Sequence, residues 1–329
     1  MKNERVPKIS VIIPLYNKAP YIKRAIDSVL SQTIQDFEIV VVGGNSSDGG
    51  EEIVHGYSES RIHFVEEQGQ GVSSARNQGV REARADLIAF LDADDEWASN
   101  FLETILILRE YYPHAGFYGT GCYINKNGKK TACIYNDNKG EQLIHNYFRA
   151  KNSFGDFIII TSAMVIPKKI FLSVGGFPRK YIQHEDRYLR ARIALDYDVA
   201  YSPKLCAIYH FNYATYSNRA RKYVEEPFSK YIEEHYDKIK YKSNIDDIIE
   251  FCDRGKNGVI QLNLEWNKDK KRVRKDIQSI TSQKLRFKKY YLLILSYMPS
   301  TMVHLQRVTI TRIRDIKEKV PHKNIRNIL

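Results

Sequence analysis

The sequence has few cysteines and no long hydrophobic run. Its four cysteines are scattered and form no C-x-x-C pair, which argues against a zinc site or a disulfide framework and favours reduced packing residues. They are Cys122, Cys133, Cys206 and Cys252. No stretch of about 18 apolar residues is present, so the sequence predicts no membrane-spanning helix. The segment from Met1 to Pro7 lacks the apolar centre of a signal peptide, and we therefore expect a cytoplasmic protein.

Acidic residues are scarce only in the last part of the chain. From Lys268 to Leu329 there are 17 Lys and Arg against 4 Asp and Glu, whereas residues 1–267 carry 34 against 35. The formal net charge of +12 therefore belongs to the C-terminal part. With 329 residues, 43% of them hydrophobic, the chain is long enough to bury a full core, as one large domain with an extension or as two domains.

Apolar runs and helical patterns alternate in the N-terminal part of the chain. The strand-like runs are residues 9–13, 37–42, 61–65 and 86–91. Strands that alternate with helices predict an α/β fold, in which a mostly parallel sheet is flanked by helices. The segments after the first, second and fourth strands then meet at one edge of the sheet, where such folds bind ligands. We expect Asn17, the 43–48 loop and residues 92–95 to face a common nucleotide-binding cleft.

The fourth apolar run ends in three carboxylates. Asp92 and Asp94 have a D-x-D spacing, and Asp95 follows them. Hard oxygen ligands suit Mg²⁺ or Mn²⁺, which bind through one or two carboxylates together with substrate phosphates. The alternative is an acidic loop in which one aspartate caps the next helix.

Four motifs occur along the chain in a fixed order. They are Ser10 to Asn17 (SVIIPLYN), Gly71 to Gly79 (GVSSARNQG), Phe90 to Trp97 (FLDADDEW), and Val174 to Phe177 followed by His184 to Asp186. This set resembles family 2 glycosyltransferases, which have the Rossmann-like GT-A fold. The resemblance covers about residues 8–215. We expect residues 1–215 to form this domain and residues 216–329 to form a helical, basic C-terminal extension.

The resemblance implies roles for residues on the donor side. The donor-binding positions are matched by Pro14, Tyr16, Asn17, Asn45, Asp48, Arg76 and Asp92. Asp94 matches the direct ligand of a divalent cation, Mn²⁺ or Mg²⁺, and Asp92 lies nearer the ribose and phosphate. His210 follows an apolar segment at a place where some members hold the metal, although most histidines so placed belong to the core or its rim. Arg76 is expected either to contact the site or to pair with an acid and hold its helix.

Two neighbouring acids match the acceptor side of the family. Asp186 corresponds to the carboxylate that takes the proton of the acceptor hydroxyl in inverting members, and Glu185 is its usual neighbour. The alternative is that both acids stand at a helix N-terminus, where they complement the helix dipole.

The loop after the second strand departs from the family pattern. Members commonly carry two acids and a glycine there, and the first acid contacts the nucleotide base, but this chain has Gly43, Gly44 and Asn45. Glycine offers only backbone groups to an N–H donor. UDP-sugar remains the first expectation, and the identity of the nucleotide stays open.

The C-terminal part combines basic charge with a short apolar run. Basic residues at 284–289 precede the apolar run at 290–298, which suits a helix lying on an anionic membrane surface. The alternative is a helix packed on the catalytic domain with solvated charges. No nucleic-acid recognition motif accompanies the basic residues, so we expect no nucleic-acid partner.

These patterns together predict an inverting, metal-dependent glycosyltransferase. It would move a sugar from a nucleotide-sugar donor to a glycan or a lipid-linked acceptor in cell-surface polysaccharide or glycoconjugate synthesis. It would act as a peripheral protein at the inner face of the cell membrane. The alternative is a catalytically silent module that binds sugar nucleotides or glycans with the same fold.

Overall fold

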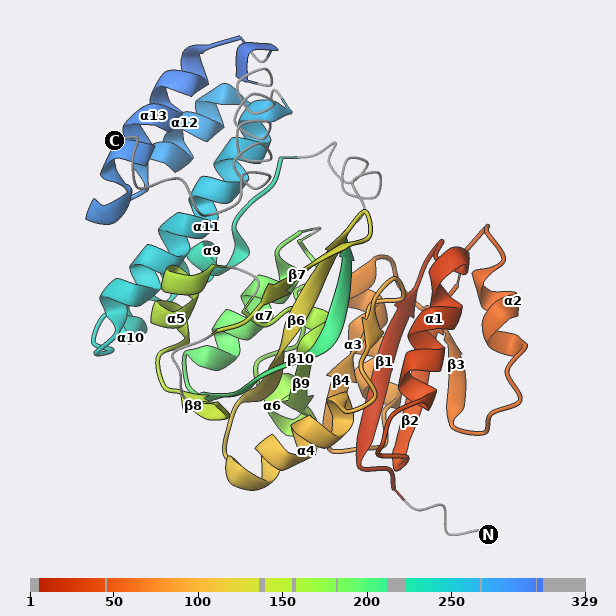
Figure 1. Ribbon diagram of the computed structural model, residues 1–329. Helices are drawn as coiled ribbons and strands as arrows, with labels where there is room; N and C mark the ends of the chain where they lie inside the picture. The colour runs from red at the N-terminus through yellow and green to blue at the C-terminus, as the bar shows by residue number, and fades with distance from the viewer. Residues whose placement is uncertain are drawn as a thin grey trace, which may run out of the picture.

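A ten-stranded mixed sheet flanked by helices forms the body of the protein (Figure 1). The computed structural model describes residues 6–44, 46–135, 140–155, 158–181, 183–211, 223–266, 268–299 and 301–303. The strand order is β3-β2-β1-β4-β9-β6-β10-β5, with β7 paired to β6 and β8 paired to β10. The predicted α/β class with a central sheet is therefore confirmed. None of the described helices is long and apolar enough to cross a bilayer.

The N-terminal half is a parallel unit in which each strand is followed by a helix. Its elements are β1 (Ile9–Leu15), α1 (Ala19–Leu30), β2 (Phe37–Gly43), α2 (Gly50–His55), β3 (Ile62–Glu66), α3 (Val72–Glu82) and β4 (Leu87–Phe90). β1 pairs in parallel with both β2 and β4, and β2 pairs with β3. Because all these strands run the same way, their carboxyl ends reach the same edge of the sheet. The predicted order of strands and helices is confirmed.

The second half makes the sheet mixed. Its elements are β5 (Glu96–Trp97), α4 (Phe101–Tyr111), β6 (Phe117–Lys126), β7 (Lys129–Cys133), β8 (Gln142–Ile144), α5 (Tyr147–Phe154), β9 (Met164–Pro167), α6 (Lys168–Ser173), α7 (Glu185–Ala194) and β10 (Val199–Phe211). β9 runs antiparallel to both β4 and β6, whereas β10 runs parallel to β6.

One strand is shorter than the sequence pattern indicates. The apolar run at 157–166 suggests a strand, but Thr161–Ala163 is a 3₁₀ turn and only Met164–Pro167 is extended. The turn is held by Ser162, whose hydroxyl donates to Asp95 Oδ2 at 2.5 Å and whose carbonyl accepts from Trp97 Nε1 at 2.5 Å. These two contacts join the turn to residues that follow β4, and β9 begins directly after the turn, at Met164.

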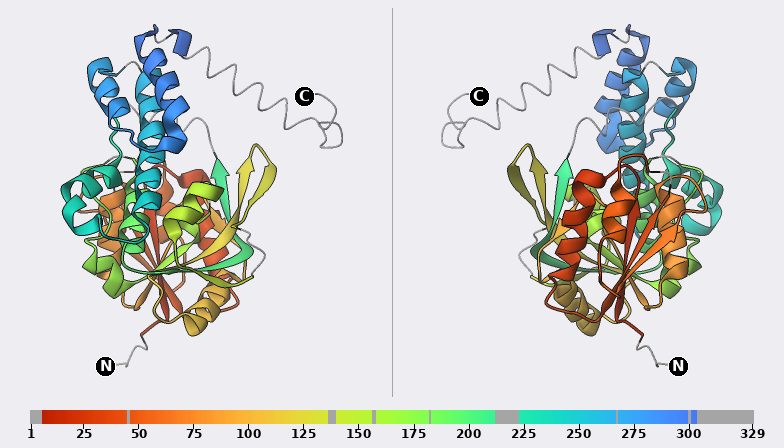
Figure 2. Two further views of the ribbon diagram at one scale, coloured as in Figure 1. Left: turned by 90° about the vertical axis from the view of Figure 1, so that its left-hand side faces the viewer. Right: turned by 90° about the vertical axis from the view of Figure 1, so that its right-hand side faces the viewer.

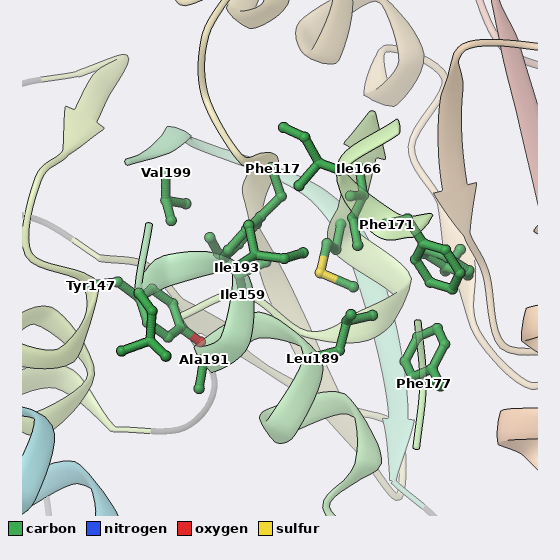
Figure 3. Close-up of a cluster of buried hydrophobic side chains, with 14 of the residues drawn as sticks. Phe117, Tyr147, Ile159, Ile166, Phe171, Phe177, Leu189, Ala191, Ile193 and Val199 are labelled. Atoms are coloured by element: carbon green, nitrogen blue, oxygen red, sulfur yellow. The ribbon is translucent and has the colours of Figure 1, made fainter. Parts of the chain in front are cut away.

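Apolar side chains fill both faces of the sheet. Figure 3 shows one of these clusters, to which Phe117 of β6, Tyr147 of α5 and Leu189 of α7 belong. The contact between α3 and β1 is especially close, because a Cβ at Gly79 would lie 2.4 Å from Ile12 Cγ2. Only glycine fits there, and this close packing places the side chains of α3 against the end of the sheet.

A helical extension follows the sheet. It contains α9 (Pro227–Glu234), α10 (Tyr236–Ile239), α11 (Ile245–Glu265), α12 (Lys270–Gln278) and α13 (Arg286–Tyr297). The predicted helical character is thus observed, and a short break separates α11 from α12. α11 ends at Glu265, and α12 begins at Lys270 because Asp269 accepts hydrogen bonds from the backbone N–H groups of Lys271 and Arg272.

The extension has two differently packed parts. Phe228, Ile248 and Phe251 belong to the same apolar cluster as Phe148 and Leu189 of the part that contains the sheet. Farther along, Ile260 of α11 belongs to a separate cluster that α11 shares with α12 and α13. Figure 2 shows this second part standing away from the sheet. The domain boundary at residue 215 stays a prediction, and the core itself continues across that position.

A buried arginine joins the extension to α7. Arg187 Nε donates to Glu226 Oε1 at 3.1 Å, and the guanidinium lies 3.5 Å from the ring centroid of Phe251 and donates to the carbonyl of that residue. The Arg187 and Glu226 side chains are only 9% and 2% exposed. Since Arg187 follows Asp186 directly, the extension holds the start of α7 in place.

We expect Arg187→Ala to lower the free energy of unfolding by about 3–5 kcal/mol, because it leaves the buried Glu226 carboxylate without its partner. Urea unfolding followed by circular dichroism measures this loss. Arg149→Ala is the matched control: Arg149 also joins the body to the extension, through Asp247, but its side chain is 72% exposed. That control should cost at most about 1 kcal/mol. Equal losses for the two variants would contradict the assigned role of Arg187.

Candidate functional site

The ends of β1 and β2 are joined by short polar contacts. Asn17 has a left-handed backbone with φ of 49°, and its Oδ1 accepts from the backbone N–H of Ser47 at 2.9 Å. In return the N–H of Asn17 donates to Ser46 Oγ at 3.2 Å. The two loops that were expected to face a common cleft therefore contact each other directly.

Asp48 fixes the start of α1 on the same edge. Its Oδ2 accepts from the N–H of Ala19 at 2.8 Å, which satisfies one free donor of the helix N-terminus. Pro14 lies in β1 opposite Val42, and Tyr16 is 61% exposed at the mouth of this region. Asn45, which was expected to bind the donor, lies outside the described residues. The other four donor-side residues of these loops are brought together.

The two carboxylates of the D-x-D spacing pair with different basic side chains. Asp94 forms an ion pair with Lys18, and its backbone carbonyl accepts from Arg24. Asp92 accepts from Arg76 Nη2 at 2.5 Å. The Asp92 and Asp94 side chains are 29% and 24% exposed, so both remain accessible to a ligand.

Asp95 has a different environment from its neighbours. It is 1% exposed and accepts from Ser162 Oγ and from the N–H of His210, the latter at 3.0 Å. Burial raises the pKa of Asp95 well above its ordinary value, and the charges of Asp92 and Asp94 act in the same direction. Asp95 therefore joins the loop after β4 to β10 and the 3₁₀ turn.

A divalent cation fits the carboxylates at the end of β4. The ammonium of Lys18 already occupies a cation position on Asp94. Within the part of the chain that the structure describes, no cluster of three or more His, Cys, Asp or Glu could hold a metal ion. Asp92 and Asp94 offer one or two carboxylates, and binding of Mg²⁺ or Mn²⁺ by them, with substrate phosphates as further ligands, stays a prediction.

His210 has both ring nitrogens engaged. Its Nε2 lies 2.9 Å from Glu96 Oε1 and its Nδ1 lies 3.3 Å from Asn125 Nδ2. Metal ligation by His210 stays a prediction, and it would require His210 to exchange one of these contacts for the cation.

Arg76 links the donor side to the acceptor side. Its side chain is 4% exposed and pairs with Glu185 Oε1 at 3.0 Å as well as with Asp92. Burial disfavours the guanidinium charge, but the charges of Asp92 and Glu185 outweigh it and raise the pKa of Arg76. The guanidinium also lies 5.0 Å from the ring centroid of Phe177. Arg76 therefore pairs with acids, as one of the two alternatives predicts, and its contact with a bound donor stays a prediction.

Asn77 holds the loop between α6 and α7. Its Nδ2 donates to the carbonyl of Phe177 at 2.8 Å, and its Oδ1 accepts from the N–H of Phe177 at 2.9 Å. A Cβ at Gly176 would lie 2.7 Å from Asn77 Oδ1, and Gly176 has φ of 70°. Gly176 therefore leaves room for the Asn77 side chain, which holds the loop that precedes Glu185.

Glu185 and Asp186 form the N-terminus of α7, and their environments differ. Burial raises the pKa of Glu185, as do the charges of Asp186 and Asp92, although Arg76 acts in the opposite direction. Burial also disfavours the Asp186 carboxylate, but Arg190, whose Nη2 donates to Asp186 Oδ2 at 2.8 Å, lowers the pKa of Asp186 overall. The Glu185 and Asp186 side chains are 12% and 33% exposed. Asp186 is the more accessible member of the pair, and Arg190 favours its charged form.

Several residues of the site had no recognisable sequence signal. Lys18, Arg24 and Arg190 pair with the acids from positions that no motif includes. Glu67 lies beside Gly44, where an added Cβ would be 3.2 Å from the Glu67 nitrogen and 3.6 Å from its Cβ. Glu67 Oε1 is buried and accepts no hydrogen bond from any of the residues that the structure describes, and burial raises the pKa of this carboxyl. The end of β2, which lacks the acid common in the family, therefore lies beside an acid that directly follows β3.

Known proteins share this fold and these motifs. Residues 10–171 match the family model described as glycosyl transferase family 2. The chain is 34% identical over 128 residues to an uncharacterized glycosyltransferase, EpsJ, of Bacillus subtilis, which covers 38% of this chain and 37% of the relative. It is 35% identical over 128 residues to the GalNAc(5)-diNAcBac-PP-undecaprenol beta-1,3-glucosyltransferase of Campylobacter jejuni, covering 37% and 40%.

The whole fold resembles a solved structure. The crystal structure of S. aureus TarS 1-349 in complex with UDP-GlcNAc superposes with a TM-score of 0.59 and 16% identity, and the match covers 92% of each chain. The curated relatives named above are matched over only about two fifths of their length. The family model over residues 10–171, the relatives and the shared fold agree with the sequence motifs, and this part of the chain is a domain of glycosyltransferase family 2.

Proposed function

We propose that this protein is an inverting, metal-dependent glycosyltransferase of polysaccharide or glycoconjugate synthesis. The observation that carries the proposal is the double ion pair of Arg76, which brings Asp92 of the D-x-D spacing and Glu185, the neighbour of Asp186, to one guanidinium. A metal-site acid and an acceptor-side acid that lie far apart in the sequence are thereby neighbours in one site. Sugar transfer needs both a stabilised leaving group and a base for the acceptor hydroxyl.

The proposed donor is a nucleotide diphosphate sugar, with UDP-sugar as the first candidate. The neighbouring fold of TarS was solved with UDP-GlcNAc, and the polar loops after β1 and β2 occupy the edge of the sheet where α/β folds bind nucleotides. Asp94, with Asp92 beside it, would hold Mn²⁺ or Mg²⁺. When bound, such a cation neutralises negative charge that develops on the departing diphosphate.

Asp186 is the proposed general base. Its carboxylate is ionised because Arg190 stabilises the charge, and a third of its side chain is exposed. Each carboxylate oxygen can accept more than one hydrogen bond, so contacts with Arg190 and with the N–H of Arg187 leave room for an acceptor hydroxyl. Thr161 Oγ1, 3.3 Å from Asp186 Oδ2, helps to orient the carboxylate.

We expect Asp94→Asn to weaken UDP binding in Mn²⁺ by about tenfold or more, because a charged metal contact is lost. Chelation of the metal should weaken wild-type binding similarly and leave the variant unchanged. Isothermal titration of UDP with and without Mn²⁺ measures both effects. Asp86→Asn, at the opposite end of the same apolar run, is the control and should behave as wild type. Undiminished Mn²⁺-dependent affinity in the Asp94 variant would remove this assignment.

Asp186→Asn keeps the shape of the side chain but cannot take a proton. We expect turnover to fall by on the order of 10²-fold or more while UDP affinity changes little. The measurement is UDP release from the nucleotide sugar that the wild-type chain uses. Asp246→Asn is a matched control, since Asp246 is an exposed acid in the first turn of α11. A product with retained anomeric configuration would argue against direct displacement.

We also propose that Glu67 recognises the nucleotide base in place of the acid missing at Gly43. Within the described part of the chain no group donates to its buried oxygen, and the N–H of a uracil ring would supply a donor. Glu67→Ala should weaken UDP binding by about tenfold, since a hydrogen bond to a charged group contributes about 1.5–3 kcal/mol. Glu66→Ala, the exposed neighbour, is the control. Competition between UDP and other nucleoside diphosphates measures the change, and an unaltered preference would rule out this role.

The proposed acceptor is a hydroxyl of a glycan or a lipid-linked glycan at the inner face of the cell membrane. The name of the Campylobacter jejuni relative includes a polyprenyl-linked glycan, which supports an acceptor of this class. The excess of 17 Lys and Arg over 4 Asp and Glu from Lys268 onward supports a peripheral association with an anionic membrane.

A further inference from the structure

Helix α13 has two apolar faces, and the described residues pack against one of them. Leu292 and Leu295 are buried in the cluster that α13 forms with α11 and α12. The other face presents Phe287, Tyr290, Ile294 and Tyr297, whose exposed fractions are 89%, 55%, 59% and 70%. These residues recur every third or fourth position, so they lie on one side of the helix. Tyr291, at 36% exposed, lies at the margin of this side.

This exposed face differs from the rest of the described surface. Single exposed hydrophobic side chains, such as Tyr111 and Tyr241, are normal in a soluble protein. A continuous row of large apolar side chains marks an interaction surface. We call the row formed by Phe287, Tyr290, Ile294 and Tyr297 the α13 face.

Basic side chains surround the α13 face. Residues 270–297 contain nine Lys and Arg and one acidic residue, Asp276. Arg286 and Lys288 are exposed on either side of Phe287 in the sequence, Arg274 of α12 lies 4.7 Å from the ring centroid of Tyr297, and Lys284 pairs with Glu250. The partner that fits must therefore be apolar at its centre and negatively charged at its rim. An anionic lipid surface has this arrangement, with headgroup charges above acyl chains.

We propose that the α13 face docks into the interfacial region of an anionic bilayer. The helix has 12 residues and would lie along the membrane plane, since it is too short to cross the hydrocarbon core. Tyrosines suit this depth, because their rings are apolar and their hydroxyls reach the headgroups. The packed face keeps α13 attached to α11 and α12 while the other face inserts.

The position of the extension relates this surface to the candidate site. Figures 1 and 2 show the extension rising from the end of the sheet at which β1, β2 and β4 finish, which is also the end that holds Asp92 and Asp94. A bilayer that contacts α13 therefore lies on the side of the molecule from which the site is reached. Docking itself does not depend on sugar transfer, whereas the conclusion that the acceptor is presented by lipid rests on the proposed function.

The test uses the full chain and vesicles of equal parts phosphatidylglycerol and phosphatidylcholine. The double variant Phe287→Ser/Ile294→Ser should sediment less with vesicles. Its partition constant should fall by about tenfold or more, because two large apolar side chains no longer insert. Tyr111→Ser/Tyr241→Ser removes two equally exposed rings elsewhere and should bind as wild type. Raising the salt concentration should weaken wild-type binding and leave a remainder that the first variant lacks.

Other occupants of the α13 face give different results. If a second copy of the chain covers it, the double variant changes the mass in solution and leaves vesicle binding intact. If residues 304–329 cover it, the variant lowers the melting temperature and again leaves vesicle binding intact. Either result, or equal binding by the variant and wild type, overturns the proposal. UDP affinity of the same variants is expected to equal that of the wild type. If the wild type itself does not bind UDP, that result counts against the proposed function and leaves the docking proposal untouched.

Discussion

The candidate site depends on one buried guanidinium that holds two acids from different halves of the chain. Arg76 is almost fully buried, and it pairs with Asp92 at the end of β4 and with Glu185 at the start of α7. A buried cation is tolerated only when it is paired, so the positions of these carboxylates are tied to each other. The close packing of α3 at Gly79 fixes Arg76 relative to the sheet, and the Asn77 contacts with Phe177 fix the loop before α7 relative to α3.

The two neighbouring acids of α7 lie in different surroundings. Glu185 faces Arg76 and Asp92, whereas Asp186 faces Arg190 and remains accessible. The same division separates the three aspartates after β4: Asp95 is buried and joins secondary-structure elements, while Asp92 and Asp94 stay open to a ligand. Charge alone did not distinguish these residues, but the partner and the burial of each one do.

The extension contributes to the catalytic body as well as to a separate surface. Arg187, the residue after Asp186, is held by Glu226 and Phe251, so the geometry of the proposed base depends on residues beyond the motifs of the family. The distal helices form their own apolar cluster and leave the α13 face exposed. One extension thus supports the site at its near end and offers a basic, aromatic surface at its far end.

The sequence by itself determined the order of strands and helices in the first half, the D-x-D and Glu-Asp acids and the basic C-terminal part, because these depend on local periodicity and composition. Only the tertiary structure decided that β9 is short and antiparallel, that Arg76 joins Asp92 to Glu185, and that Glu67 stands beside Gly44. Such contacts join residues far apart in the chain, and no local pattern encodes them. The same limit applies to α13. Its apolar residues surround the helix, so the pattern allowed either packing or docking, and packing on α11 and α12 determined which face remained exposed.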